Sequence, residues 1–185
     1  MSKTIKFGTL FMAALCASAA QAATLTYNYT GNEFTVAVSP QTTTNFVSGS
    51  FTLPAALGDN LFNEAITPST YSFSDGLQTM TNANSAIEFF DISTGGSGQI
   101  TGWYIYLYTV GELDNDIIYT SSIYGGGIVC GVCDFVSNVN SGESGEVIND
   151  PGTWTPEPST VALMSLGILA GAFVARKRLV HPGVR

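Results

Sequence analysis

Two cysteines, Cys130 and Cys133, stand in the segment GGGIVCGVCDF and have the widest chemical repertoire of any residues in the central part of the chain. In an oxidising compartment a pair with this spacing usually closes on itself. A redox-active pair normally sits at a helix N-terminus, whereas a glycine-rich, strand-like run precedes this one. Zinc needs four ligands, and this region offers neither histidine nor a second cysteine pair. We therefore expect a structural disulfide, with a redox pair, a metal site or free thiols as the alternatives.

A short acidic cluster follows the longest apolar run of the central region. The segment ELDNDIIY contains Glu112, Asp114 and Asp116, whose oxygens are the ligands that Ca²⁺ prefers. The spacing does not match the calcium-binding loop, which needs further ligands and a glycine at a fixed position. A solvated turn is therefore the favoured interpretation. We expect no cofactor, with Ca²⁺ as the weaker alternative.

Aromatic residues gather in the segment GWYIYLYTV. Strand alternation places Trp103 on one face and Tyr104 and Tyr106 on the other, and both faces are bulky, which predicts a central strand. Flat rings stack on the apolar faces of sugars, so Trp103, Tyr104 and Tyr106 are candidates for binding polysaccharide. The favoured alternative is that tyrosine simply suits a half-buried pleated surface.

The region from residue 23 to residue 155 contains no lysine, arginine or histidine, but thirteen of the fourteen acidic residues of the chain. Side-chain salt bridges are therefore unavailable there, and nucleic acid is excluded as a direct partner, because binding it requires cations that displace counterions. A Ser-His-acid triad and a Schiff-base lysine are excluded as well. Two paired carboxylates remain able to hydrolyse glycosides, but we expect a protein that is not an enzyme.

Short runs of threonine, tyrosine, isoleucine, valine and phenylalanine alternate with polar residues through the whole central region, and glycine, asparagine, aspartate and proline separate them. This pattern predicts an all-β fold, an antiparallel β-sandwich or jelly roll over residues 23–155. Asp75-Gly76 predicts a hairpin turn. The segment 54–66 predicts a loop, and the last strand is expected at about 146–149, with a linker from Trp154 to Pro158. The predicted strands occupy residues 24–30, 33–39, 47–53, 70–76, 77–81, 86–93, 99–110 and 116–125.

Both ends of the chain carry targeting features. Residues 1–22 have a basic start, an apolar stretch and a small-residue cleavage site at Ala20-Gln21-Ala22, which indicates a secretory signal peptide. At the other end, residues 161–175 carry no charge and are followed by Arg176, Lys177 and Arg178. Basic residues remain on the cytoplasmic side of a membrane helix, so these three residues predict a stop-transfer signal after a transmembrane helix at residues 160–175.

The C-terminal features occur in a fixed order that resembles a known sorting signal. Pro156, Glu157, Pro158 and Ser159 precede the apolar run, and the basic cluster follows it. Residues 156–185 thus resemble the PEP-CTERM sorting tag of Gram-negative bacteria. The resemblance implies recognition by a membrane-embedded exosortase, a transient inner-membrane stage, cleavage near the motif, and transfer to the cell surface or release. The central region is similar to uncharacterised β ectodomains that precede this tag.

These observations predict an exported protein of the cell surface or extracellular matrix, with a structural or interaction role in the extracellular polymer layer, as in a biofilm. A polysaccharide-binding module is the first alternative, and a carboxylate-based glycosidase is the second. An exposed row of aromatic side chains would favour the binding module. A cleft that holds two carboxylates would favour the glycosidase.

Overall fold

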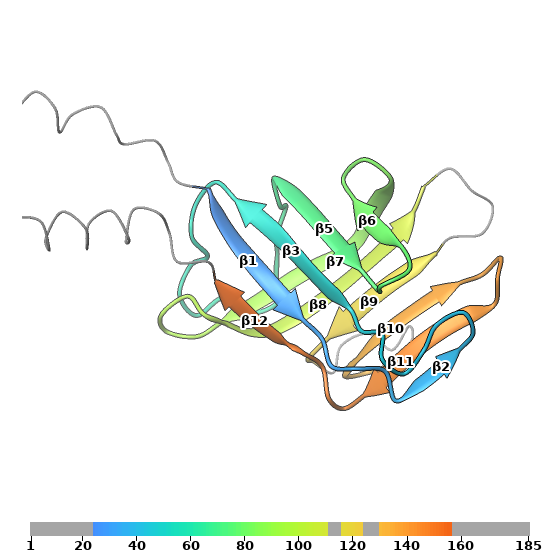
Figure 1. Cartoon of the computed structure of the whole chain (residues 1–185). Coiled ribbons are helices and arrows are strands. Elements are labelled where there is room, and N and C mark those ends of the chain that lie inside the picture. The colour runs from blue at the N-terminus through green and yellow to red at the C-terminus, as the bar shows by residue number, and fades with distance from the viewer. Residues whose placement is uncertain (1–23, 111–115, 124–129, 157–185) are drawn as a thin grey trace, which may run out of the picture.

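The structure is a computed structural model that describes residues 24–110, 116–123 and 130–156. Two antiparallel sheets pack face to face as a sandwich (Figure 1). The five-stranded sheet has the order β12 (Thr153–Pro156), β1 (Leu25–Thr30), β3 (Ser48–Leu53), β5 (Thr70–Ser74) and β6 (Thr79–Thr81). The seven-stranded sheet has the order β2 (Val36–Val38), β11 (Glu143–Ile148), β10 (Cys133–Asn138), β9 (Ile117–Ser121), β8 (Ile100–Thr109), β7 (Ser85–Thr94) and β4 (Glu64–Ala65). The all-β sandwich predicted from the sequence is confirmed.

The core lies between the two sheets and follows the alternation of the strands. Tyr27 and Tyr29 of β1 and Phe51 of β3 point into it from the five-stranded sheet. Ile105 and Leu107 of β8 meet them from the seven-stranded sheet, and both are fully buried. Each fully buried side chain of this size contributes about 1.5–3 kcal/mol relative to an exposed one. The core is therefore the main source of the stability of a domain whose described residues include no lysine or arginine.

Strand β12 is a feature that the sequence analysis did not predict. It was expected to be a linker, but it pairs with β1 in antiparallel register, with Trp154 opposite Tyr29 and Pro156 opposite Tyr27. The Trp154 ring lies 5.0 Å from the Tyr29 ring, 5.2 Å from Phe51 and 6.2 Å from Trp103, measured between centroids. Aromatic pairs in such tilted and edge-to-face arrangements add about 0.5–1.5 kcal/mol each beyond their buried area. The last described strand is thus held firmly in the core.

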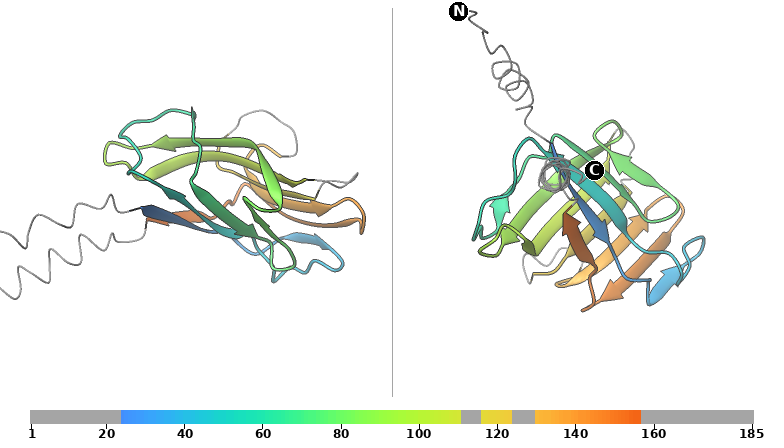
Figure 2. Two further views of the ribbon diagram at one scale, coloured as in Figure 1. Left: turned by 90° about the horizontal axis from the view of Figure 1, so that it is seen from above. Right: turned by 60° about the vertical axis from the view of Figure 1, so that its left-hand side comes forward.

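The turn that leads into β12 requires a glycine. A Cβ atom at Gly152 would collide with the carbonyl oxygen of Thr30 and with the Cα atom of Gly31. The amide of Gly152 donates a hydrogen bond of 2.7 Å to the hydroxyl oxygen of Tyr29. The chain therefore passes close over the end of β1 before it joins the sheet, and the described ends, Thr24 and Pro156, leave the sandwich from the same end (Figure 2).

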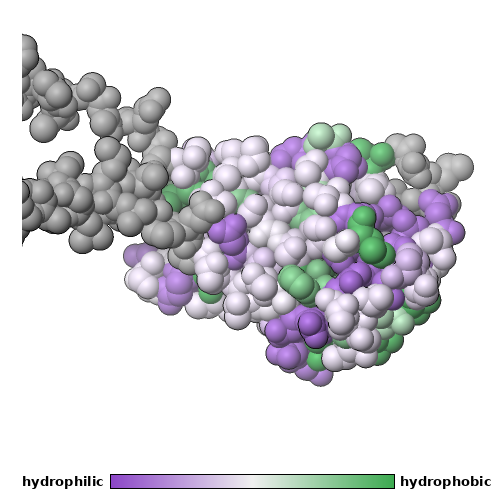
Figure 3. All heavy atoms as spheres, in the orientation of Figure 1, coloured by the Kyte–Doolittle hydropathy of each residue, from purple (hydrophilic) through white to green (hydrophobic). Residues whose placement is uncertain are grey.

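Three further predictions can be compared with the structure. The hairpin at Asp75-Gly76 is present between β5 and β6, with Gly76 at φ 93°. The loop predicted at residues 54–66 is present over 54–63, but Glu64–Ala65 form the short edge strand β4, which was not predicted. The strand predicted at residues 33–39 is shorter in the structure, where β2 covers Val36–Val38 at the sheet edge. Phe34 before it is buried, but the side chains of Val36 and Val38 are exposed. Figure 3 shows hydrophobic surface at the lower right, where β2 lies.

The targeting segments fall outside the part of the chain that the structure describes. These are the signal peptide at residues 1–22, the predicted transmembrane helix at 160–175 and the basic cluster Arg176, Lys177 and Arg178. Among residues 24–110, 116–123 and 130–156, no helix has the length and apolar character to cross a membrane.

Candidate functional site

The three aromatic residues proposed to stack on sugars do not share one surface. Trp103 faces the core, where its Nε1 atom donates a hydrogen bond of 2.8 Å to Oγ1 of Thr120 and its ring contacts Tyr29. It is 6 % exposed. Tyr104 and Tyr106 point to the opposite, outer face of the seven-stranded sheet, as alternation predicts. Trp103 is therefore a core residue in this fold and leaves the candidate sugar-stacking set.

The outer face of the seven-stranded sheet carries an aromatic cluster of its own, which we call the outer aromatic cluster. Strands β7 to β10 each contribute to it, and its side chains are Phe89, Tyr104, Tyr106, Tyr119 and Phe135. The ring of Tyr104 meets Phe89 at a centroid distance of 5.0 Å and Tyr119 at 5.5 Å, in both cases edge to face. Rings that interlock in this way form a small second core, in which Tyr104 and Tyr119 are buried and Tyr106 keeps a half-exposed surface.

Acidic side chains border the outer aromatic cluster. Burial, followed by the neighbouring Tyr119 and Asp91, raises the pKa of the Tyr104 hydroxyl. Burial and then Glu88 raise that of Tyr106. Neutral phenols beside carboxylates give this face hydrogen-bond donors and acceptors but no positive charge. Such a surface suits the hydroxyl groups of a neutral sugar and repels an anionic one.

The cysteine pair lies at the edge of the outer aromatic cluster. Cys130 and Cys133 form a disulfide whose Cα atoms are 6.0 Å apart. Cys133 begins β10 and is fully buried, and the Tyr119 hydroxyl donates a hydrogen bond of 2.9 Å to the carbonyl oxygen of Cys130. The structure thus brings the two cysteines to disulfide distance at the start of β10, and the structural role of the pair stays a prediction.

Only one member of the acidic cluster proposed for Ca²⁺ lies within the described residues. Glu112 and Asp114 lie outside them. The half-buried Asp116 is held through its backbone: its amide donates to Oγ1 of Thr109 at 3.0 Å, and its carbonyl oxygen accepts from the Thr109 amide at 3.1 Å. Within the described part of the chain, no group of three or more histidine, cysteine or acidic side chains is placed to hold a metal ion.

A buried carboxylate that the sequence analysis did not single out lies between the two sheets. Asp134 of β10 has no exposed surface, and its Oδ1 atom accepts a hydrogen bond of 2.6 Å from the Tyr29 hydroxyl. Desolvation raises the pKa of Asp134 to about 7, although Thr120, Tyr29 and the Gly152 amide lower it in part. Asp134 lies on the same face of β10 as Val136, and its place in the core follows from the pairing of β10 with β9 and β11, which the sequence analysis did not predict. No substrate reaches a side chain enclosed in this way.

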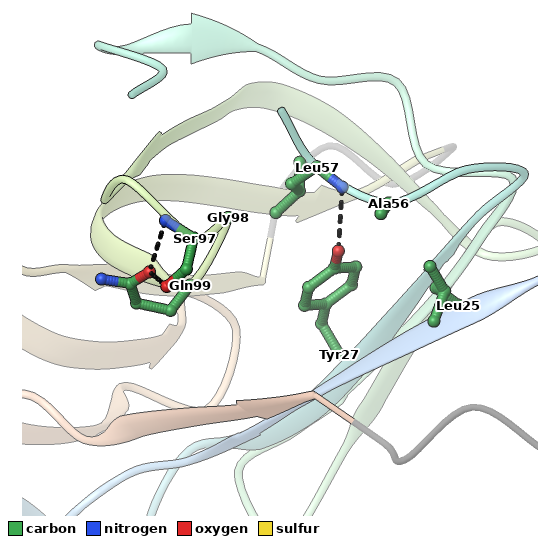
Figure 4. A pocket seen from close by; sticks show the side chains of 7 residues that line it. All are labelled: Leu25, Tyr27, Ala56, Leu57, Ser97, Gly98 and Gln99. Atoms are coloured by element: carbon green, nitrogen blue, oxygen red, sulfur yellow. Dashed lines mark hydrogen bonds between the residues drawn. The ribbon is translucent and has the colours of Figure 1, made fainter. Parts of the chain in front are cut away.

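A shallow apolar hollow of about 210 Å³ opens at the end of the sandwich where Thr24 and Pro156 lie (Figure 4). Leu25 and Tyr27 of β1 form one wall, Ala56 and Leu57 form another, and the turn at residues 97–99 closes the third. The Tyr27 hydroxyl accepts a hydrogen bond of 3.0 Å from the Leu57 amide, which fixes the loop over β1. Few polar groups converge here, so the hollow lacks the donors and acceptors that orient a small ligand.

The predicted sorting motif begins within the folded domain. Pro156 is the final residue of β12, and Glu157, Pro158 and Ser159 lie outside the described residues. The PEP-CTERM protein-sorting motif matches residues 155–178, which include the apolar run and the basic cluster. Neither a curated protein nor a solved structure matches the chain. The chain therefore carries, over residues 155–178, the PEP-CTERM sorting motif of exosortase substrates, which supports an exported protein that is sorted to the cell surface.

Proposed function

We propose that the processed domain is a non-catalytic component of the extracellular polymer layer with a structural or interaction role. The observation that carries this proposal is the direct attachment of the sorting motif to a self-contained sandwich, whose last strand ends at Pro156. Because the last strand ends at the first residue of the sorting motif, cleavage after this point would leave every strand of the sandwich in the delivered domain. Its acidic surface keeps it soluble and repels anionic polymers.

The chemistry of the described side chains supports a role without catalysis. Asp134, whose pKa is raised most among the carboxylates, is enclosed in the core and does not line a cleft. Tyr104 and Tyr119, whose pKa values are raised, belong to the outer aromatic cluster and pack on each other. Tyr29, whose pKa burial raises further, is enclosed in the core. A carboxylate-based glycosidase remains the weaker alternative. No cofactor is part of the proposal, and Ca²⁺ at Glu112, Asp114 and Asp116 is the weaker alternative to a solvated turn.

The proposed processing partner is a membrane-embedded exosortase, acting while the chain is held in the inner membrane. Cleavage near Pro156 would separate the sandwich from the apolar run. Changing the motif at Pro156, Glu157 and Pro158 to alanine is then expected to leave the chain in the membrane fraction. Glu64→Gln, an exposed acid of β4, is the matched control and should be sorted normally. Equal surface delivery of both variants would contradict the proposal.

A polysaccharide-binding module is the second candidate, and the outer aromatic cluster favours it. Tyr106 is half-exposed and has acidic neighbours, so a neutral sugar chain would find both a ring and hydrogen-bond acceptors there. The edge-to-face packing of the cluster opposes a broad flat platform and limits stacking to single rings.

The test is co-sedimentation of the surface-released protein with the extracellular polysaccharide of the producing cells. The binding module would be supported if Tyr106→Ala reduced binding to the polysaccharide several-fold. The control Leu77→Ala, at an exposed position on the β5–β6 turn, should leave binding unchanged. Retention in the matrix that neither variant changes would support the structural role. A released protein that stays soluble apart from the matrix would overturn both.

A further inference from the structure

The end of the sandwich that carries Pro156 also carries the most exposed of the large apolar side chains that the structure describes. Phe62 is 83 % exposed, more than any other large hydrophobic residue that the structure describes. It lies in the loop 54–63, whose Leu57 amide donates a hydrogen bond to the Tyr27 hydroxyl. Tyr27 is also the residue of β1 that pairs with Pro156. We call this loop, the β7–β8 turn at 95–99 and the start of β1 the exit end (Figure 2).

Hydrogen bonds hold the exit end in a fixed shape. The Leu61 amide donates to Oγ1 of Thr94 at 3.0 Å, and the Leu61 carbonyl oxygen accepts from the Thr94 amide at 3.0 Å. The Asn60 amide donates to the Gly95 carbonyl oxygen at 3.0 Å. The side chain of Leu61 packs against the core, so the residue directly before Phe62 is held both by its backbone hydrogen bonds and by its side chain. The exposed ring is therefore presented by a rigid support.

The chain between the sandwich and the apolar run is very short. From Pro156 to Val161, the first residue of the uncharged run, there are five residue steps, which reach at most roughly 18 Å when fully extended. A fifteen-residue helix rises only about 22 Å, against a hydrocarbon core of about 30 Å. Flanking residues must therefore be drawn toward the membrane, which shortens the connection further.

This length decides which surface of the domain faces the bilayer. The headgroup layer on one side is about 5–8 Å thick, so Pro156 lies within roughly 10 Å of the lipid surface while the chain is in its membrane intermediate. The sandwich cannot turn its far end toward the lipid on such a connection. The exit end, with Phe62, Ala56 and the apolar hollow, is the part of the domain that is brought to the interface.

We propose that the exit end is a membrane-contacting surface, in which Phe62 inserts into the lipid interface and orients the sandwich during sorting. Exposed Trp, Phe and Leu side chains of interfacial segments are buried at the boundary between headgroups and acyl chains, because this removes apolar surface from water. The contact rests on the membrane intermediate of the proposed sorting route. It is apolar rather than electrostatic, because the sandwich has no basic residue to attract anionic lipid. Cleavage of the connection therefore frees the domain, since one exposed ring cannot hold an acidic protein on a membrane.

Depth-dependent fluorescence quenching tests this surface. Full-length chain without its signal peptide is reconstituted into phosphatidylcholine vesicles that carry a headgroup spin label, after a solvent-sensitive fluorophore has been attached at Phe62→Cys. The matched control is Val139→Cys, which is 56 % exposed on the β10–β11 turn at the opposite end. Quenching several-fold stronger at position 62 than at position 139 is expected. Equal quenching at the two positions, or stronger quenching at 139, would overturn the proposal.

A second variant separates the role of the ring from the role of the connection. With the fluorophore at Ala56→Cys, quenching should fall when Phe62→Asp is added, because a charged side chain leaves the interface. Unchanged quenching would show that Phe62 does not orient the domain. Proteolytic removal of the C-terminal tag should then release the domain from the vesicles and abolish quenching at both exit-end positions.

Flotation of the vesicles distinguishes this inference from the sorting route itself. A full-length chain that does not float with lipid would contradict the membrane intermediate as well as the contact. A chain that floats but shows no preferential quenching at position 62 would contradict the contact alone. In cells that contain exosortase, a photo-crosslinker at position 62 should label lipid, and a crosslink to protein would assign the surface to a protein partner instead.

Discussion

Two buried aspartates show how differently one domain can accommodate a carboxylate that has no cation to pair with. Asp75, in the β5–β6 turn, accepts from the amides of Leu77 and Gln78 at 2.8 Å each and from Nε2 of Gln41 at 2.8 Å. Asp134, between the sheets, accepts a 2.6 Å hydrogen bond from Tyr29, but its Oδ2 atom is buried without a hydrogen-bond partner of good geometry. One carboxylate is surrounded by N–H donors, and the other is mainly desolvated.

The difference lies in how many hydrogen-bond donors each carboxylate meets. Three N–H donors complete the turn at Asp75 and satisfy both of its oxygens. At Asp134 burial outweighs the donors and raises the pKa to about 7, so the neutral acid is the favoured form in the folded core at acidic pH. Of these two aspartates, Asp134 is therefore the one expected to make the stability of the domain depend on pH.

The largest expected effect is a loss of stability as the pH rises. The folded-state pKa of Asp134, about 7, lies above its ordinary value of 3.8, so the folded state binds the extra proton between these values. The stabilising contribution is complete below about pH 4 and is lost as the pH rises through 7, by up to about 4 kcal/mol. Urea unfolding of the released protein at about pH 5 and at about pH 8 measures this difference.

Asp134→Asn is the control, because it removes the titration and keeps an oxygen for the Tyr29 hydroxyl. The variant should be more stable than the wild type at about pH 8, and its dependence on pH should be much flatter. Surface carboxylates also repel one another more as the pH rises, and that contribution remains in the variant. A variant with the full wild-type slope would attribute the pH response to the surface.

The next effect concerns Asp75. Asp75→Ala leaves the amides of Leu77 and Gln78 and the amide group of Gln41 without their acceptor, and should lower the free energy of unfolding by about 2–3 kcal/mol. Asp75→Asn keeps the acceptor for the two backbone amides and should cost about half as much. Denaturation at neutral pH compares the two variants. Equal losses would show that the charge, not the turn geometry, stabilises this site.

A smaller effect is expected at Tyr29, which connects Asp134 to the turn before β12. Tyr29→Phe removes the donor to Asp134 and the acceptor of the Gly152 amide, at a cost of about 1–2 kcal/mol. Because this hydrogen bond lowers the pKa of Asp134, its loss should move the pH of destabilisation upward. Tyr27→Phe, which loses only the bond to the Leu57 amide, is the matched control and should leave that pH unchanged.

The sequence predicted the parts of this fold that depend on local alternation. Trp103 and Tyr104 were assigned to opposite faces of a central strand, and β8 is central, because period-two patterning fixes which way neighbouring side chains point. The face that each side chain covers was not predictable. Trp103 became a core residue only because β1 and β12 pack over it, and these strands lie far from it in sequence.

Two misses share this long-range origin. β12 has only four residues and ends in a proline, so its one strong strand signal is the aromatic ring of Trp154. That ring packs against Tyr29 and Phe51, which come from strands distant in sequence. Asp134 stands between Cys133 and Phe135, in a segment without clean alternation, and its burial depends on sheet pairing with β9 and β11. Neither feature has a local pattern that separates it from a loop.

Salt gives the smallest effect and separates the surface carboxylates from the buried ones. Thirteen acids without a base within residues 23–155 repel one another, and screening reduces that repulsion as the Debye length falls from about 30 Å at 0.01 M to about 8 Å at 0.15 M ionic strength. The melting temperature at about pH 8 should therefore rise by about 2–3 °C over this range of NaCl. Asp134 is buried, so the difference in melting temperature between the wild type and Asp134→Asn should stay the same in both salts. If that difference shrank with NaCl, the instability at Asp134 would arise from long-range repulsion by the surface acids rather than from desolvation. Asp134 and Asp75 would then differ in the electrostatic potential at their positions in the domain and not in their local hydrogen bonds.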